Sequence, residues 1–230
     1  MTNKNNSGSF GSSRGLLNKI KKDKKRKSSS TRWIGRQLND PYVLETQKRG
    51  YKSRAAFKLL QINDKFNFLL PGLSVIDLGC APGGWLQIAS EKVSSITGNE
   101  KVIGVDILKT DDIAGCKSII GDINDKAVGD HLIELLGQKP DIVLSDMAVN
   151  TTGNKNLDSI QTSELCLDAM HFSKDVLKND GKFISKIFVG STFNEIIAES
   201  KKIFKKSKVF KPNASRKESK ESFIICSMLR

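Results

Sequence analysis

The distribution of apolar and polar residues changes along this chain of 230 residues. Residues 1–30 are mainly Asn, Ser, Gly and Lys, whereas from about residue 70 short apolar runs alternate with longer amphipathic stretches. A short apolar run bounded by glycine or aspartate is typical of a buried strand, and apolar residues at helical spacing are typical of a helix. The pattern predicts strands at about 75–78, 101–107, 118–120, 141–146 and 182–188, and helices at about 84–93, 128–136 and 157–177.

The two ends of this region differ from its middle. Before it, apolar residues among charges at 40–62 predict two short helices, interrupted by Gly50. After it, a helix at about 192–204 is followed by two apolar runs, 207–210 and 222–228, with no helix between them. Strands joined by helices run parallel, whereas two strands joined by a loop usually run antiparallel. We therefore expect an α/β fold with a seven-stranded, mostly parallel sheet, an antiparallel terminal strand and helices on both faces.

Positive charge is concentrated at the N-terminus. The formal net charge is +13, and residues 1–36 hold eleven lysines and arginines against one acid, Asp23. So polar a segment cannot bury enough apolar surface to fold alone, and its charge is suited to binding polyanions. We divide the chain into a basic, disordered tail, residues 1–31, and a folded domain, residues 32–230. A solubility tail or a targeting sequence is the alternative, although a transit peptide would have spread arginines rather than clustered lysines.

Other features exclude several classes of protein. No apolar stretch approaches the length of a membrane span, and the N-terminus has no apolar signal-peptide core, so we expect a soluble, cytoplasmic protein. The cysteines of the chain are Cys80, Cys116, Cys166 and Cys226, and its histidines are His131 and His171. These spacings do not indicate a zinc site. We expect no bound metal and free, mostly buried thiols.

The apolar run at 75–78 ends in an abrupt cluster of glycine and proline. The sequence from Val75 to Trp85 reads V-I-D-L-G-C-A-P-G-G-W, which predicts a strand, a tight turn and the start of a helix. Its glycines allow positive φ or close approach to a ligand. A helix that begins there directs free N–H groups into the crevice at the carboxyl end of the strand, where open α/β sheets bind nucleotides. Because the spacing is neither G-x-G-x-x-G nor a P-loop, the sequence predicts a nucleoside site rather than a dinucleotide site.

This loop closely resembles the S-adenosylmethionine loop D-L-G-x-A-P-G-G-W of the FtsJ/RrmJ family of ribosomal RNA 2′-O-methyltransferases. The resemblance extends from about Ser28 to the C-terminus and implies a Rossmann-like class I methyltransferase fold that binds S-adenosylmethionine. It implies cofactor contacts at Gly83, Trp85, Asp106, Asp122 and Asp146. A carboxylate after the second strand can accept hydrogen bonds from both ribose hydroxyls, and one after the third can accept from the adenine amino group. Strand-end aspartates are also common as helix caps and turn formers, and that alternative stays open.

Methylation of a ribose hydroxyl needs a base, because the hydroxyl is a weak nucleophile until its proton is removed. The resemblance implies a catalytic set of Lys58, Asp146, Lys186 and Glu221. Lys186 is informative by itself, since a cation within the apolar strand 182–188 is costly without a partner or a purpose; a strand-end lysine that extends to water is the alternative. We predict that Lys186 accepts the proton, that Lys58 lowers its pKa, and that the two acids orient the ammonium groups. Glu218 is the rival of Glu221, which we prefer because it adjoins the last strand.

A second basic zone lies near the C-terminus. Residues 201–220 hold nine lysines and arginines against one acid. Four more cations precede the main sheet: Lys48, Arg49, Lys52 and Arg54. Together they are suited to binding RNA phosphates, with a solvated charged face as the alternative. Few aromatic residues are available for base stacking.

From the resemblance we expect a monomeric enzyme that methylates a uridine of large-subunit (23S) ribosomal RNA, preferring the assembled subunit. Two alternatives stay open: a transfer RNA or cap 2′-O-methyltransferase with the same four residues, and a non-catalytic ribosome-assembly factor that binds RNA. The chain departs from the family at one position, because the family usually has proline where Val149 stands. Without that proline, the loop after the fourth strand loses one backbone restraint.

Overall fold

The computed structural model describes residues 34–35, 38–149, 153 and 155–230. The contacts within the chain divide it into two compact units, residues 1–45 and residues 46–230. Helix α2 (Pro41–Arg49) begins in the first unit, where the Asp40 carboxylate accepts a hydrogen bond of 3.0 Å from the Tyr42 N–H and so caps the helix. The basic tail that the sequence predicts, residues 1–31, lies outside the described residues.

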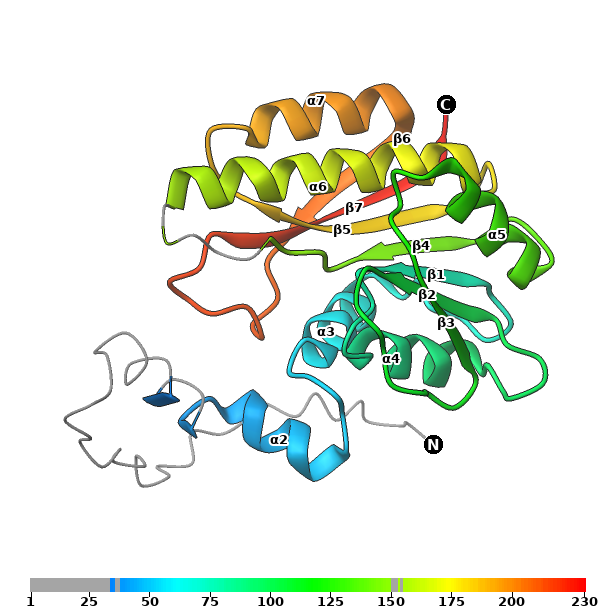
Figure 1. Cartoon of the computed structure of the whole chain (residues 1–230). Coiled ribbons are helices and arrows are strands. Elements are labelled where there is room, and N and C mark those ends of the chain that lie inside the picture. The colour runs from blue at the N-terminus through cyan, green and yellow to red at the C-terminus, as the bar shows by residue number, and fades with distance from the viewer. Residues whose placement is uncertain (1–33, 36–37, 150–152, 154) are drawn as a thin grey trace, which may run out of the picture. The chain divides into compact units, whose positions relative to one another are not determined.

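The described part of residues 46–230 is built on a seven-stranded sheet (Figure 1). In chain order the strands are β1 (Val75–Leu78), β2 (Val102–Asp106), β3 (Cys116–Ile120), β4 (Ile142–Ser145), β5 (Lys182–Phe188), β6 (Phe204–Phe210) and β7 (Glu221–Leu229). Their spatial order is β3-β2-β1-β4-β5-β7-β6, and of the described strands β7 alone runs in the direction opposite to all the others. The predicted α/β fold with an antiparallel terminal strand is therefore confirmed.

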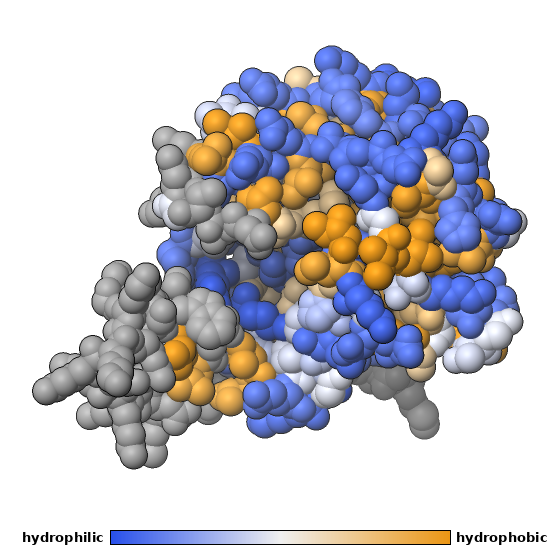
Figure 2. Space-filling model, viewed as in Figure 1, coloured by the Kyte–Doolittle hydropathy of each residue, from blue (hydrophilic) through white to orange (hydrophobic). Residues whose placement is uncertain are grey.

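Helices cover both faces of this sheet (Figure 1). One face carries α3 (Ala56–Phe66) and α4 (Gly84–Val93), and the other carries α5 (Lys126–Leu136), α6 (Lys155–Val176) and α7 (Phe193–Ile203). Figure 2 shows that the outer surface over α6 and α7 is mainly hydrophilic, as expected for helices that bury one side only. None of the described helices has both the length and the apolar character that crossing a membrane requires.

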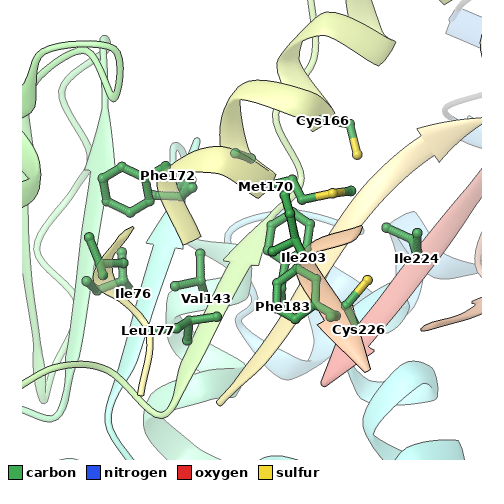
Figure 3. Close-up of a cluster of buried hydrophobic side chains, with 14 of the residues drawn as sticks. Ile76, Val143, Cys166, Met170, Phe172, Leu177, Phe183, Ile203, Ile224 and Cys226 are labelled. Atoms are coloured by element: carbon green, nitrogen blue, oxygen red, sulfur yellow. The ribbon is translucent and has the colours of Figure 1, made fainter. Parts of the chain in front are cut away.

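Successive side chains along a strand point to opposite faces of the sheet, and so they pack into two separate hydrophobic cores. Val143 of β4 belongs to the core beneath α6, whereas its neighbours Ile142 and Leu144 belong to the core beneath α3 and α4. Figure 3 shows the first of these cores, in which Met170 and Phe172 of α6 lie near side chains from the strands. The central strands β1 and β4 are therefore buried on both faces, whereas the edge strands β3 and β6 are largely exposed.

The boundary that differs most among the predicted strands is the start of β6, which begins three residues earlier than expected. Helix α7 ends at Ile203, and Phe204 is already extended, with φ −117° and ψ 149°. No loop separates the helix from the strand, so the chain passes directly from one to the other. The polar composition of this strand concealed its start in the sequence.

The strand order reverses at β1, with β2 on one side and β4 on the other, so that the loops after β1 and β4 are neighbours at the carboxyl edge, where open α/β sheets bind ligands. Gly79, the first residue after β1, has a φ of +73°. A Cβ on Gly79 would come within 2.5 Å of Met147 Cγ in the loop after β4. Glycine at this position therefore satisfies both the backbone conformation and the close approach of the two loops.

Gly79→Ala is expected to lower the free energy of unfolding by more than Gly137→Ala. Both glycines have positive φ, +73° and +70°, so each substitution introduces backbone strain of about 1–2 kcal/mol. At Gly79 the new Cβ also overlaps a neighbour, whereas nothing lies within 4 Å at Gly137, and such overpacking costs about 1–3 kcal/mol more. Urea unfolding followed by circular dichroism measures the difference. Equal losses in the two variants would contradict the described contact between the loops.

Candidate active site

Lys186 lies in β5, on the face that α3 and α4 cover. Phe183 and Ile187 point into the opposite core, and Ile184 shares the face of Lys186, as the strand alternation predicts. The Lys186 Nζ lies 3.2 Å from Asp146 Oδ1 and donates a hydrogen bond of 2.8 Å to the Asp146 carbonyl oxygen. Because Lys186 is only 6% exposed, it does not extend to water and instead finds its partner at the end of β4.

Lys58 reaches the same carboxylate from α3. Its Nζ lies 3.4 Å from Asp146 Oδ2 and 2.8 Å from Glu221 Oε2. The adjacent apolar residues Leu59 and Ile62 are fully buried against the sheet, and Lys58 is itself 8% exposed. Lys58 is therefore a buried residue at the carboxyl edge rather than an ordinary surface lysine of a helix.

Glu221 reaches the site because β7 is antiparallel. It is the first residue of β7 and pairs with Phe188, the last residue of β5. In a strand parallel to β5, the first residue would lie at the opposite edge of the sheet. Glu218, its rival in the sequence, lies in the exposed part of the β6–β7 loop, and Glu221 is the acid that contacts Lys58.

The four side chains form a chain of alternating charges, in the order Lys186, Asp146, Lys58, Glu221. Burial by itself would raise the pKa of Asp146, but Lys186 and Lys58 outweigh it and hold the pKa of that carboxyl below its usual value. Burial would lower the pKa of Lys58, yet Asp146 and Glu221 together raise it above its usual value. Lys58 therefore remains a cation at neutral pH and cannot itself act as a base.

Asp106 and Asp122 follow the predicted strand ends, and both also stabilise turns. Asp106 accepts hydrogen bonds from the N–H groups of Ala81, at 2.9 Å, and Leu108, at 2.8 Å, and so ties the end of β2 to the glycine loop. Asp122 Oδ1 accepts from the backbone and side-chain N–H groups of Asn124. A carboxylate has about four acceptor positions, so a turn-forming role leaves room for a ligand.

Gly83 and Trp85 lie at the start of α4. Gly83 is the residue before the first turn and has a φ of +108°. The Trp85 side chain is buried against α3 and β7, where its Nε1 donates to the Ala55 carbonyl at 2.9 Å and its ring centroid lies 5.8 Å from that of Phe223. The indole therefore holds helices together, which the sequence did not predict. What Trp85 can offer a ligand is its backbone N–H in the first turn of the helix.

Asp77 of β1 is a further candidate site residue, to which the sequence analysis assigned no contact. Both its carboxylate oxygens are buried and have no hydrogen-bond partner among the described residues. Burial, reinforced by Asp146 and Asp106, raises the pKa of Asp77 well above its usual value. The signal in the sequence was an acid inside the apolar strand V-I-D-L, where a charge needs a partner. Asp77 is thus placed to receive a cationic ligand beside the glycine loop.

The cysteines agree with the expectation of free, mostly buried thiols. All four are free, and Cys80, Cys166 and Cys226 are buried. Burial raises the pKa of Cys80 and of Cys166 to about 12, which makes these thiols unreactive at neutral pH. In the part of the chain that the structure describes, no three His, Cys, Asp or Glu side chains are grouped so that they could hold a metal ion.

The strand order, with an antiparallel strand inserted before the outermost one, is that of a Rossmann-like class I methyltransferase. The position of the glycine loop and of the four paired side chains, at the carboxyl edge of the sheet, agrees with this class. A model of the FtsJ-like methyltransferases matches residues 51–228, and the chain belongs to that family.

Individual relatives support this assignment. The protein named ribosomal RNA large subunit methyltransferase E in Pelagibacter ubique is 48% identical over 206 residues, which cover 90% of this chain and 100% of the relative. The protein of the same name in Paramagnetospirillum magneticum is 45% identical over 226 residues, which cover 97% of this chain and 93% of the relative. A crystal structure described as that of a ribosomal RNA methyltransferase from Plasmodium falciparum matches with a TM-score of 0.68 and 33% identity, over 78% of this chain and 98% of that one.

Asp77→Asn is expected to stabilise the ligand-free protein, and more at pH 7 than at pH 4. The folded-state pKa of Asp77 lies above the ordinary value of 3.8, so between these two pKa values the folded state binds the proton that the unfolded state has lost, and wild-type stability falls as pH rises. Asparagine removes that dependence. Urea unfolding at both pH values measures the effect, with the exposed Asp122→Asn as control. A gain that is equal at pH 4 and pH 7, or a loss, would contradict this account of Asp77.

Proposed function

We propose that this chain transfers a methyl group from S-adenosylmethionine to the ribose 2′-hydroxyl of a uridine in large-subunit (23S) ribosomal RNA. It acts in the cytoplasm, as a monomer, on the assembled subunit. The observation that carries the proposal is the buried, paired set Lys58, Asp146, Lys186 and Glu221. The named relatives, which cover at least 90% of this chain, support the class of RNA.

The residues present fit S-adenosylmethionine. Its ammonium and sulfonium groups are cationic, and Asp77 has two buried oxygens without a hydrogen-bond partner among the described residues. Asp106 and Asp122, at the ends of β2 and β3, are the proposed acceptors for its ribose and adenine, and Gly83 supplies the positive φ of +108° with which the chain enters α4. When bound, the cofactor supplies an electrophilic methyl group and leaves as a neutral thioether, which needs no acid.

Lys186 is the proposed base. In its uncharged form, its Nζ takes the proton of the 2′-hydroxyl and becomes an ammonium, which makes the ribose oxygen nucleophilic. Asp146 holds this amine through both its carboxylate and its carbonyl oxygen, at 3.2 and 2.8 Å, and thereby fixes its direction. Lys58, kept as a cation by Asp146 and Glu221, supplies the permanent positive charge that the hypothesis requires beside the base.

The basic zone near the C-terminus is the proposed RNA-binding surface. Its exposed cations are Lys201, Lys202, Lys205, Lys206, Lys208, Lys211, Lys217 and Lys220. β6 is an edge strand, where lysines also prevent pairing with another chain, but so many cations with one acid exceed that need and suit a phosphate backbone. Of the cations before the sheet, Arg49 lies over the Phe57 ring, Lys52 pairs with Asp111 and Arg54 donates to the Ala214 carbonyl, so these three already have protein partners.

Lys186→Ala is expected to reduce methyl transfer by about 10²–10⁴-fold, as for loss of a general base, while leaving S-adenosylmethionine affinity largely unchanged. Radiolabelled cofactor and large subunits from cells lacking the enzyme measure turnover, and calorimetry measures affinity. Lys182→Ala, at the other end of β5, is the matched control and should remain active. Wild-type turnover in Lys186→Ala would refute the role of Lys186.

The RNA class is tested with the wild-type protein in the same assay. Assembled large subunits, small subunits and transfer RNA are offered separately, and the methylated ribose is then mapped by primer extension. Methylation of a uridine in the large subunit supports the proposal. Methylation of transfer RNA alone would favour the alternative substrate, and no methylation of any RNA would favour a non-catalytic assembly factor.

A further inference from the structure

The loop between β6 and β7, residues 211–220, is anchored to the helix that carries Lys58. Ala214, which is fully buried, is held through both its backbone groups. Its N–H donates to Gln61 Oε1 at 2.8 Å, and its carbonyl oxygen accepts from Arg54 Nη2 at 2.7 Å. Gln61 lies within α3 and Arg54 just before it, so the loop and α3 are fixed to each other beside the active site.

The same loop is closed on itself. Lys211 Nζ donates to the carbonyl oxygens of Lys217, at 3.3 Å, and Ser219, at 2.5 Å. The Glu221 N–H in turn donates to Ser219 Oγ at 3.1 Å. A loop fixed at its middle and at its end can hold a side chain in one position, which a loose surface loop could not do.

Ser215 connects this loop to the catalytic set. Its Oγ donates a hydrogen bond of 2.6 Å to Glu221 Oε1, while Glu221 Oε2 accepts from Lys58 Nζ at 2.8 Å. Hydroxyl-to-carboxylate bonds of this length are charge-assisted. Ser215 is 4% exposed, so water competes little for the bond. Each oxygen of the Glu221 carboxylate is thus held by one partner, the loop on one side and Lys58 on the other.

We propose that Ser215 is a positioning residue of the active site: it holds one oxygen of Glu221 so that the other faces Lys58 and keeps that cation beside Asp146. The inference rests on the proposed function, in which Glu221 and Lys58 belong to the catalytic set. Ser215 acts through Glu221 and not on the reacting groups. Without the hydroxyl, the carboxylate is free to rotate about its side-chain bonds, and Lys58 loses the fixed position of its shortest ionic contact.

The kinetic test compares Ser215→Ala, Ser215→Thr and Ser207→Ala in the labelled-cofactor assay. Ser215→Ala should lower kcat by about 10- to 100-fold, the effect of a misplaced catalytic group, with the KM for large subunits and the affinity for S-adenosylmethionine unchanged. Ser215→Thr keeps the hydroxyl and should restore kcat to within a few-fold, and Ser207→Ala, in β6 of the same hairpin, should match the wild type. Wild-type kcat in Ser215→Ala, or equal impairment of the Ala and Thr variants, would overturn the proposal.

A second measurement does not depend on activity. Ser215→Ala should raise the equilibrium constant for unfolding by about tenfold in the wild-type background, as expected for a hydrogen bond to a charged group, and by far less in the Glu221→Ala background. Equal effects in the two backgrounds would overturn the proposal. If the wild-type protein methylates no RNA, the proposed function fails. The comparison of unfolding in the two backgrounds still reports whether Ser215 holds Glu221.

Discussion

Two buried lysines that must be neutralised determine the arrangement at the carboxyl edge of this sheet. Lys58 and Lys186 are 8% and 6% exposed, and one carboxylate, Asp146, lies within 3.4 Å of both. Removing one partner from such a set leaves an uncompensated buried charge and costs about 3–5 kcal/mol. Apolar replacement of a whole buried ionic set is often neutral or stabilising. Stability alone therefore does not explain these residues, which agrees with the chemical role proposed for them.

The fold meets this constraint by bringing distant segments of the chain to one edge. Lys58 and Glu221 are separated by 163 positions in the sequence. Because β7 runs antiparallel to β5, Glu221 lies beside the end of β5. The reversal of strand order at β1 sets the loops after β1 and β4 next to each other. Asp146 lies immediately after β4, so the site proposed for the cofactor and the residues proposed to act on the ribose are neighbours.

Local patterns in the sequence were enough to predict the fold and to propose the site. Alternation along a strand is enough to separate Lys186 from Phe183 and Ile187, and the glycine loop indicated the family. Features that depend on contacts between distant segments could not be predicted from local patterns. The indole of Trp85 is used for packing, and the carboxylate of Asp77 has no hydrogen-bond partner in the described residues. Ser215 donates a hydrogen bond to Glu221. The effect of Val149 in place of the family proline stays a prediction, and so do the roles assigned to individual site residues.

The central claim is that the amine of Lys186 removes the proton from the ribose hydroxyl. Chemical rescue of Lys186→Ala by small primary amines tests it most directly, because an added amine can occupy the space of the missing side chain and serve as the base. The account predicts that methyl transfer to large subunits rises with amine concentration, and that the rescued rate depends on amine basicity. Absence of rescue by every amine, while the variant still binds S-adenosylmethionine and large subunits, would contradict it.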